Sequence, residues 1–410
     1  MIILGLIFTV IIFAFVKRNV AVWLNPFFYF IVLFIIYCLL PSLIFYYFEY
    51  NPSNANDITI LKNLNYVIYN GYVFFFFSLF ILFKKENVKT IRLLNVNTKF
   101  IIKVWLLFVF IYLLLFLITS PSIISLWQSR RVSADYWADF NSQYKFVTFS
   151  YMVISAVTYS VIKEGKPHLL FLLIPFVFFD ILTTSRSLLL FCLLGFVFNW
   201  VAVGRKPPNL TVFICSILLI SIEFVRGLFA WGELAAYDSI LITLMPKEAL
   251  NTTMSSFIVM ESNVKVESLP FLFEVISNFF RPGVFSGLYA DSISSFRDIL
   301  DAESQFEFGL GGSMLSEIYA LDSTLIYYLF PFIVCAFFWG IHKVSEKLNF
   351  LGIILNLYLI TQIYSMYRIG FFVSVPNIIY YIIYSFSWYW ILSILLRNKN
   401  QVIFREVRTL

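Results

Sequence analysis

Long apolar segments constrain this chain more than any other feature of its sequence. Runs of roughly 20 apolar residues, the length that crosses a bilayer as a helix, recur along it. Of its 410 residues, 61% are hydrophobic and only 13% are charged. A soluble domain cannot bury so much apolar surface, and a lone sheet edge cannot satisfy its backbone groups in lipid. The sequence therefore predicts an all-α integral membrane protein, with residues 1–410 forming a single polytopic membrane domain.

The apolar runs predict about 11 transmembrane helices. The first covers 1–16; it has neither the preceding basic residue nor the cleavage site of a signal peptide, so we expect it to remain as a span. The others are expected at about 27–48, 65–83, 100–118, 146–162, 168–183, 187–203, 209–225, 318–341, 349–366 and 371–396.

Basic residues set the expected orientation. Most of the 29 Lys and Arg residues lie in short connections on one side of these spans, as expected for the cytoplasmic side. The N-terminus is then outside and the C-terminus cytoplasmic. The outer connections are 49–64, 119–145, 184–186, 226–317 and 367–370. The net charge of +6 is spread over the connections, which argues against a nucleic-acid partner.

The outer segment 226–317, here called the large loop, differs from the rest of the chain. It has roughly 90 residues, far more than an ordinary connection. It is polar where its flanks are apolar, and it holds most of the acidic residues outside the spans. We expect it to be the working face of a membrane enzyme, a catalytic lid over a lipid-linked substrate held by the helices.

Three arginines stand at sharp turns on the outer side. Arg186 lies in a very short connection between two apolar segments, and Arg281 precedes a proline that prevents a helix from continuing. Arg368 lies in the turn Tyr367-Arg368-Ile369-Gly370. A guanidinium group can bind two phosphate oxygens at once, so we predict a diphosphate ligand for this set; the alternative for Arg186 is that its side chain extends to lipid headgroups. Arg226 is a further candidate diphosphate ligand, although its spacing from Glu223 favours a structural ion pair.

A glycine-rich run closes the large loop. Gly311 and Gly312 precede Ser313, and Glu317 follows one helical turn later on the same face. We predict that Gly311, Gly312 and Ser313 form a substrate-binding loop, although the strand and lysine of a P-loop are missing. The structural alternative is a helix start, with Ser313 as its cap and Glu317 in its first turn.

Carboxylates of the large loop are candidates for a general base. Glu317 and Asp291 are the residues expected in that role, although the sequence does not separate them from the other loop acids. Both histidines, His168 and His342, fall on the cytoplasmic side, which excludes an outer catalytic histidine. The spacing of Asp, Glu, His and Cys matches no metal signature, so neither a metal nor a cofactor is expected.

The pattern resembles the bacterial O-antigen polymerase (Wzy) family of oligosaccharide repeat unit polymerases. The resemblance covers most of the chain: about 11 spans, one large loop late in the sequence, the turn Ser185-Arg186, and the run from Gly309 to Tyr319. O-antigen ligases have a similar loop architecture but are expected to use a periplasmic histidine. Neither histidine of this chain is expected on that side, and this favours a polymerase over a ligase.

The resemblance implies a GT-C-like, inverting, metal-independent glycosyltransferase of the bacterial inner membrane, with the large loop in the periplasm. Two undecaprenyl-diphosphate-linked oligosaccharides would be its substrates. A hydroxyl of the incoming unit would attack the anomeric carbon of the growing chain, while Arg186, Arg281 and Arg368 stabilise the leaving diphosphate. Glu317 or Asp291 would take the proton, and a chain-length regulator of the membrane is a candidate partner.

Other functions stay open at this point. The first is a flippase or transporter of lipid-linked sugars, against which stand the single long loop and the absence of repeated halves. The second is an O-antigen ligase-like glycosyltransferase, and the third is a structural subunit of a polysaccharide-export machine.

Overall fold

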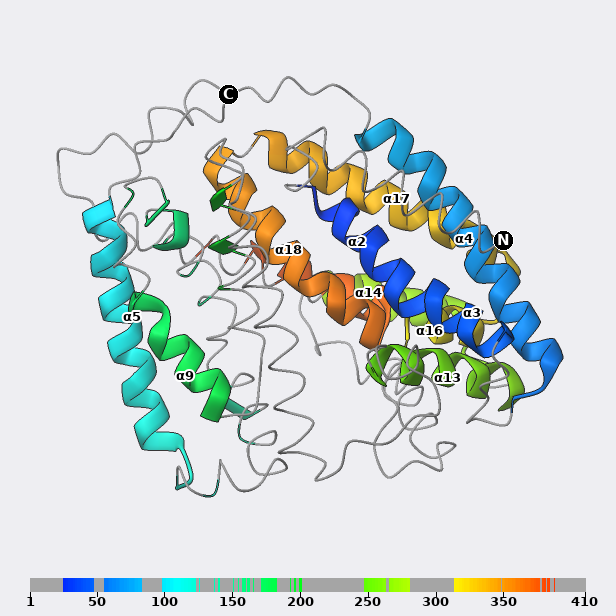
Figure 1. The fold of residues 1–410 in the computed structure, drawn as a ribbon, viewed down its shortest axis with the longest axis horizontal. Helices are drawn as coiled ribbons and strands as arrows, with labels where there is room; N and C mark the ends of the chain where they lie inside the picture. Colours follow the sequence, from blue (N-terminus) through cyan, green and yellow to red (C-terminus); the bar gives the residue numbers. More distant parts are fainter. Residues whose placement is uncertain are drawn as a thin grey trace.

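The computed structural model of this chain is built from helices (Figure 1). It describes residues 25–47, 55–82, 98–122, 171–182, 247–262, 265–280, 313–347 and 349–376, with scattered positions between 125 and 200 and between 378 and 387. Nearly all of these residues are helical, and the described extended pairing is one isolated bridge between Val266 and Leu321. The predicted all-α fold class is confirmed for the described part of the chain.

The described helices, in chain order, are α2 (Pro26–Phe34), the π-helix η2 (Ile35–Leu39), α3 (Leu40–Tyr47), α4 (Asp57–Leu82), α5 (Thr98–Thr119), α9 (Ile174–Leu182), α13 (Lys247–Ser262), α14 (Ser268–Phe280), α16 (Met314–Ala320), α17 (Thr324–Lys347) and α18 (Asn349–Ile369). Within the described residues, two stretches are long and apolar enough to cross a membrane, Pro26–Tyr47 and Thr324–Ser345, which is compatible with a membrane protein. The count of about 11 spanning helices stays a prediction.

Most helices lie where the apolar runs predicted them. The continuous stretch α2–η2–α3 matches the span 27–48, α5 matches 100–118, and α18 matches 349–366. The helix expected at 371–396 begins at Phe371, as predicted. The spans expected at 1–16 and 209–225 lie outside the described residues.

The helix that contains the expected span 65–83 begins earlier than that span, because α4 starts at Asp57 in the segment assigned to an outer connection. Asn56 caps this early start: its side chain accepts the Thr59 N–H at 2.8 Å. The Asn56 N–H in turn donates to Glu261 at 2.7 Å, so the large loop reaches the start of α4.

The predicted span 318–341 is wrong in its boundaries. The chain forms the short helix α16 first, and α17 begins only at Thr324. Between them Leu321 is extended and forms the bridge to Val266, with the Val266 N–H donating to the Ala320 carbonyl at 2.8 Å. The large loop thus pairs with this connection and separates α16 from the long helix.

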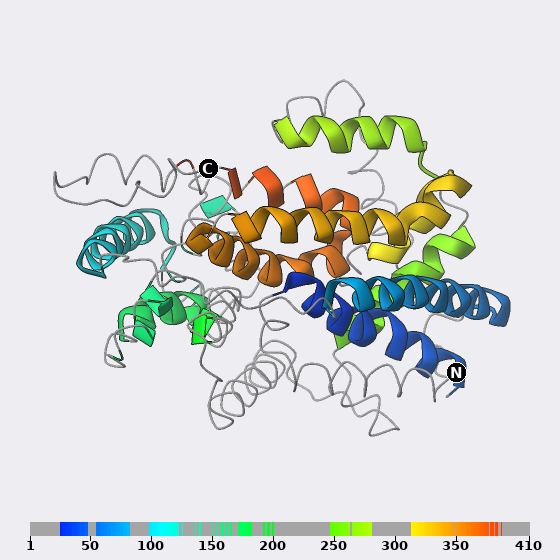
Figure 2. The ribbon, with the colours of Figure 1, turned by 90° about the horizontal axis from the view of Figure 1, so that it is seen from above.

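The long helices pack side by side through aromatic side chains. The neighbours of α2 are α4, α17 and α18. Phe30 of α2 is fully buried, and its ring lies 5.2 Å from Phe74 of α4 and 4.9 Å from Phe338 of α17. In Figures 1 and 2, α5 and α9 lie to one side of these helices, whereas α13 lies below α3 and α16 in Figure 1.

Two prolines inside the apolar helices explain where other segments attach. A proline has no N–H, so the carbonyl four residues earlier loses its helical donor. Pro41 follows the π-helix η2, and the freed Tyr37 carbonyl accepts the hydroxyl of Thr253 in α13 at 3.4 Å. Pro331 lies inside α17, and the Tyr327 carbonyl accepts the Tyr66 hydroxyl of α4 at 2.9 Å.

Candidate functional site

The end of the large loop enters the bundle through a capped helix start. Ser313 is the extended N-cap of α16; its hydroxyl accepts the Ser316 N–H at 2.9 Å, and the Ser316 hydroxyl accepts the Ser313 N–H at 2.6 Å. This capping box confirms the structural alternative that the sequence offered for Ser313 and Glu317. The substrate-binding role of Ser313 stays a prediction, and Gly311 and Gly312 lie outside the described residues.

Glu317 is a buried carboxylate at this junction, with only 2% of its surface exposed. Its Oε2 accepts the Phe372 N–H at 2.9 Å, and its Oε1 accepts the Val373 N–H at 3.0 Å. Both donors belong to the first turn of the helix that begins at Phe371, where N–H groups have no partner within the helix. Glu317 therefore joins the end of the large loop to the turn that follows α18.

Gly370 is the single residue between α18 and the helix that begins at Phe371. Its φ of +133° lies in a region that favours glycine. A Cβ at this position would lie 2.7 Å from Oε1 of Glu317 and 2.8 Å from its carboxyl carbon. The close approach of the carboxylate thus requires glycine for steric as well as conformational reasons.

Burial dominates the protonation of Glu317. Desolvation raises the pKa of this carboxyl from its ordinary 4.5 to about 7, while the backbone N–H donors at Phe372, Val373 and Phe371 act in the opposite direction. The carboxyl can therefore exchange a proton near neutral pH. Because both of its oxygens accept N–H groups, its geometry favours a positioning role over removal of a proton from a sugar hydroxyl. Its predicted role as base stays a prediction.

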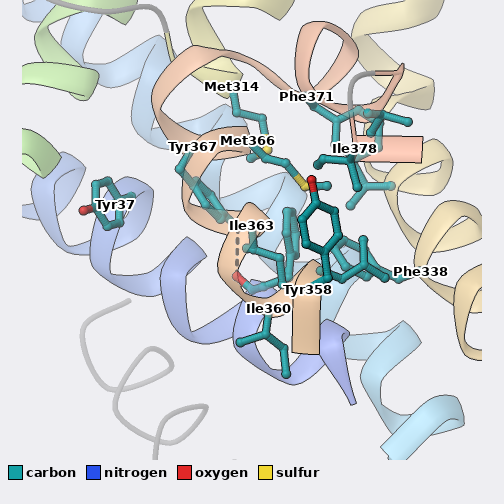
Figure 3. Packing of buried hydrophobic residues seen from close by; sticks show 14 of the residues in the cluster. Tyr37, Met314, Phe338, Tyr358, Ile360, Ile363, Met366, Tyr367, Phe371 and Ile378 are labelled. Carbon is teal, nitrogen blue, oxygen red and sulfur yellow. Dashed lines mark hydrogen bonds between the residues drawn. The ribbon is translucent and has the colours of Figure 1, made fainter. Parts of the chain in front are cut away.

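Arg368 lies in the last turn of α18 and is exposed, two residues before Gly370. The neighbouring Tyr367 is buried, and its hydroxyl donates to the Phe30 carbonyl of α2 at 2.8 Å. Figure 3 shows Tyr367 and Met366 of α18 near Met314 of α16. Tyr367 therefore holds the end of α18 in the core, whereas the side chain of Arg368 is exposed. This placement suits binding of an anion.

The fold brings together two of the predicted site residues that are far apart in sequence. Glu317 contacts Gly370, and Arg368 stands in the turn just before it. The other predicted residues, Arg186, Arg226, Arg281 and Asp291, lie outside the described residues, so the three-arginine clamp stays a prediction.

Helix α13 packs the large loop against the bundle. Its polar composition is compatible with burial because its hydroxyls bond to its own carbonyls, for example Thr252 to Ala249 at 2.9 Å and Ser255 to Thr252 at 2.7 Å. Its Ser256 hydroxyl lies 2.9 Å from that of Ser313, which ties α13 to the cap of α16. The described part of the large loop is thus packed against the rest of the described helices.

An apolar cluster supports the same attachment. Leu250, Met254 and Phe257 of α13 are buried with Ile44 and Phe45 of α3. The Phe45 and Phe257 rings meet edge to face at 5.0 Å. Burial of such side chains contributes roughly 1.5–3 kcal/mol each, which is enough to keep α13 docked.

Polar bonds fix the segment between α13 and α14. The backbone N–H and hydroxyl of Ser268 both donate to Asp322, and these bonds lower the pKa of this exposed carboxyl. The ammonium group of Lys265 donates to the Tyr319 carbonyl at 3.2 Å. These contacts hold the start of α14 at the start of α17.

Sequence reasoning missed a buried polar chain beside the site. The Tyr319 hydroxyl donates to Asn63 of α4 at 3.0 Å, and the Asn63 amide donates to the Ser42 hydroxyl of α3 at 2.9 Å. The signal available in the sequence was the pair of polar residues, Ser42 and Asn63, within or beside apolar runs. Buried polar groups need partners, and these residues supply one another.

Among the described residues, no group of three or more His, Cys, Asp or Glu side chains is placed to bind a metal ion. His342 lies near the end of α17, away from α16, consistent with its expected separation from the outer residues. Cys38, Cys192 and Cys335 are buried and form no disulfide.

The chain matches no protein-family model, and comparisons with curated proteins and with solved structures find no match either.

Proposed function

We propose that the protein polymerises undecaprenyl-diphosphate-linked oligosaccharide repeat units into O-antigen or a similar surface polysaccharide. A hydroxyl oxygen of the incoming unit forms a bond to the anomeric carbon of the growing chain. The bond from that carbon to the diphosphate oxygen breaks, the configuration inverts, and undecaprenyl diphosphate leaves. The hydroxyl proton passes to a carboxylate of the large loop, and Asp291 is a candidate for this role because backbone N–H groups hold Glu317.

One observation supports this proposal more than any other. The exposed Arg368 stands on a turn that Glu317, at the end of the large loop, holds by two hydrogen bonds to the following helix. A guanidinium at a rigid turn is suited to a diphosphate, because a preorganised donor needs no rearrangement as charge develops on the leaving group. Arg186 and Arg281 would complete this diphosphate site.

The membrane setting of the proposal rests on exposed apolar side chains. Phe110, Leu117 and Ile118 of α5 are among the most exposed hydrophobic residues, as are Leu325 and Phe332 of α17. Such surfaces need lipid around them. We place the protein in the bacterial inner membrane, with about 11 spans, the large loop and the N-terminus in the periplasm, and the C-terminus in the cytoplasm.

Contacts among the expected outer segments agree with this topology. Glu261 and Ser268 of the large loop bond to Asn56 and Asp322, which precede α4 and α17, and Glu317 contacts the turn at Gly370. Segments that meet directly lie on the same side of the membrane. A chain-length regulator in the membrane remains a candidate partner.

The deciding experiment is the surface polysaccharide of a strain that lacks this protein. A polymerase deletion leaves lipopolysaccharide with one repeat unit instead of a ladder of lengths. A flippase deletion leaves no repeat units on the lipopolysaccharide, and a ligase deletion leaves the polymer on its lipid carrier. Either of the last two results would contradict the proposal.

Complementation tests the arginine. Arg368→Ala should abolish long chains while the protein stays in the membrane, and Arg368→Lys should restore them only in part because an ammonium group cannot form paired bonds. Normal ladders from Arg368→Ala would remove this residue from the diphosphate site.

A further inference from the structure

The helix that begins at Phe371 starts without a capping side chain of its own. Its first turn follows α18 after one residue, Gly370, and the first bond within the new helix runs from the Ser374 N–H to the Gly370 carbonyl at 3.2 Å. The earlier N–H groups need acceptors from elsewhere. A residue with a capping side chain could not occupy position 370, because its Cβ would meet the Glu317 carboxylate at 2.7 Å.

Glu317 of α16 supplies acceptors for two of these N–H groups, those of Phe372 and Val373. The carboxylate is fixed from its own side as well, because Ser313 caps α16 and the Tyr319 hydroxyl bonds to Asn63 of α4. Its two bonds to Phe372 and Val373 therefore connect a short, well-anchored helix to the turn that carries Arg368.

We propose that Glu317 is a positioning residue for the diphosphate site: it caps the helix that begins at Phe371 and thereby fixes the turn from which Arg368 reaches the ligand. This inference rests on the proposed function, because it takes Arg368 to be a diphosphate ligand. It differs from the role of general base, because the carboxylate acts on backbone N–H groups and does not touch the substrate.

Loss of the cap should change the position of Arg368, because this residue is close in sequence to the capped turn. Only Ile369 and Gly370 separate this arginine from the capped turn, so movement of the turn shifts the last turn of α18. Helix ends fray when their partners are lost. A shift of about 1 Å in a binding group is enough to impair a reaction that depends on preorganised charge.

The experiment compares Glu317→Gln with a matched control. Glutamine keeps the size of the side chain but presents an amide NH2 to one of the two N–H donors. Glu261→Gln is the control, because Glu261 also belongs to the large loop and also accepts a backbone N–H at a helix start, that of Asn56. It is exposed and bonds near α4 instead of the turn at Gly370.

Two measurements on full-length protein in lipid nanodiscs give the result. Hydrogen exchange reports the cap itself, and Glu317→Gln should exchange the Phe372 and Val373 amides roughly 10- to 100-fold faster. Affinity for undecaprenyl diphosphate reports the site, and it should fall by about tenfold in Glu317→Gln, with little change in Glu261→Gln. A partly unfolded sample would lose binding capacity, whereas a displaced arginine lowers affinity.

The double variant Glu317→Gln/Arg368→Ala shows whether the two residues act together. If Glu317 acts through Arg368, the double variant binds no more weakly than Arg368→Ala alone. If the losses of affinity in the two single variants add up in the double variant, the proposal is overturned. Unchanged amide exchange or unchanged affinity in Glu317→Gln would also overturn it. If the wild-type protein fails to bind undecaprenyl diphosphate, the proposed function itself fails, which is a different result from wild-type binding that is insensitive to Glu317.

Discussion

At the scale of single residues, the buried polar groups beside the large loop are held by hydrogen-bond partners. Glu317 faces backbone N–H groups, and Asn63 lies between Tyr319 and Ser42. Each arrangement sits beside the place where the large loop joins the bundle. Changes at these residues should therefore affect both stability and the geometry of the site.

The free energy of unfolding should depend on pH because of the raised pKa of Glu317. Its pKa is raised from 4.5 to about 7, so between these values the folded protein holds a proton that the unfolded chain has released. The free energy of unfolding contributed by this carboxyl should fall by on the order of 3 kcal/mol as the pH rises through that window, and then level off. Thermal unfolding in detergent at a series of pH values measures the difference between wild type and Glu317→Gln. A constant difference would show that Glu317 does not titrate there.

Replacement of Asn63 by Ala should destabilise the protein by roughly 1–3 kcal/mol, because it leaves the buried Tyr319 hydroxyl without its acceptor, whereas the Ser42 hydroxyl keeps the Cys38 carbonyl. Asn65→Ala is the control, since Asn65 is exposed on the same helix. Unfolding of both variants by denaturant measures the effect, and equal stabilities would contradict the importance of this polar chain.

At the scale of elements, the apolar pattern predicted the long helices well but not the places where they are interrupted. The runs at 27–48 and 349–366 contain enough apolar residues to define a helix, and the structure has them there. The break between α16 and α17 depends on the bridge from Leu321 to Val266, and the early start of α4 depends on Asn56 and Glu261. Both involve partners distant in sequence, which local periodicity cannot indicate.

The one-residue connection at Gly370 should tolerate no side chain. Gly370→Ala combines an unfavourable φ with contact against the Glu317 carboxylate, and it should cost more than about 2 kcal/mol of stability. Gly340→Ala is the control: its Cβ would meet nothing within 4 Å, so it should stabilise α17 by up to about 1 kcal/mol. Unfolding temperatures in detergent compare the two.

A second variant separates the two causes. Glu317→Ala removes the contact but leaves φ at +133°, so it should not rescue Gly370→Ala. Full rescue would show that the contact alone requires glycine at this position.

At the scale of the whole molecule, the apolar segments predict a membrane protein with its large loop on one side of the bilayer, and this topology stays a prediction. The site was less predictable. The sequence predicts separate roles for Glu317 and Arg368, and only the fold shows that Glu317 binds the turn that directly follows Arg368. The chemistry of a residue type can be inferred from sequence, whereas the partner of a buried carboxylate is set by packing.

The proposed topology predicts which surface positions a membrane-impermeant maleimide can reach. In a background without the native cysteines, Lys62→Cys should react in cells whose periplasm is accessible, because Lys62 is exposed near the start of α4. Val344→Cys, which is 49% exposed near the end of α17, should react only after the inner membrane is opened. Labelling of both positions from the same side would contradict the orientation.

The burial of α13 also determines how the large loop can be studied. Excised as a fragment, residues 226–317 would present Leu250, Met254 and Phe257 to water and would lose the Tyr37 carbonyl that Thr253 contacts. Under the proposed function, exchange of this loop with that of another polymerase to alter sugar specificity should therefore fail unless the matching surfaces of α3, α4 and η2 are exchanged with it. Sugar specificity would then depend on the loop together with the surface against which it packs.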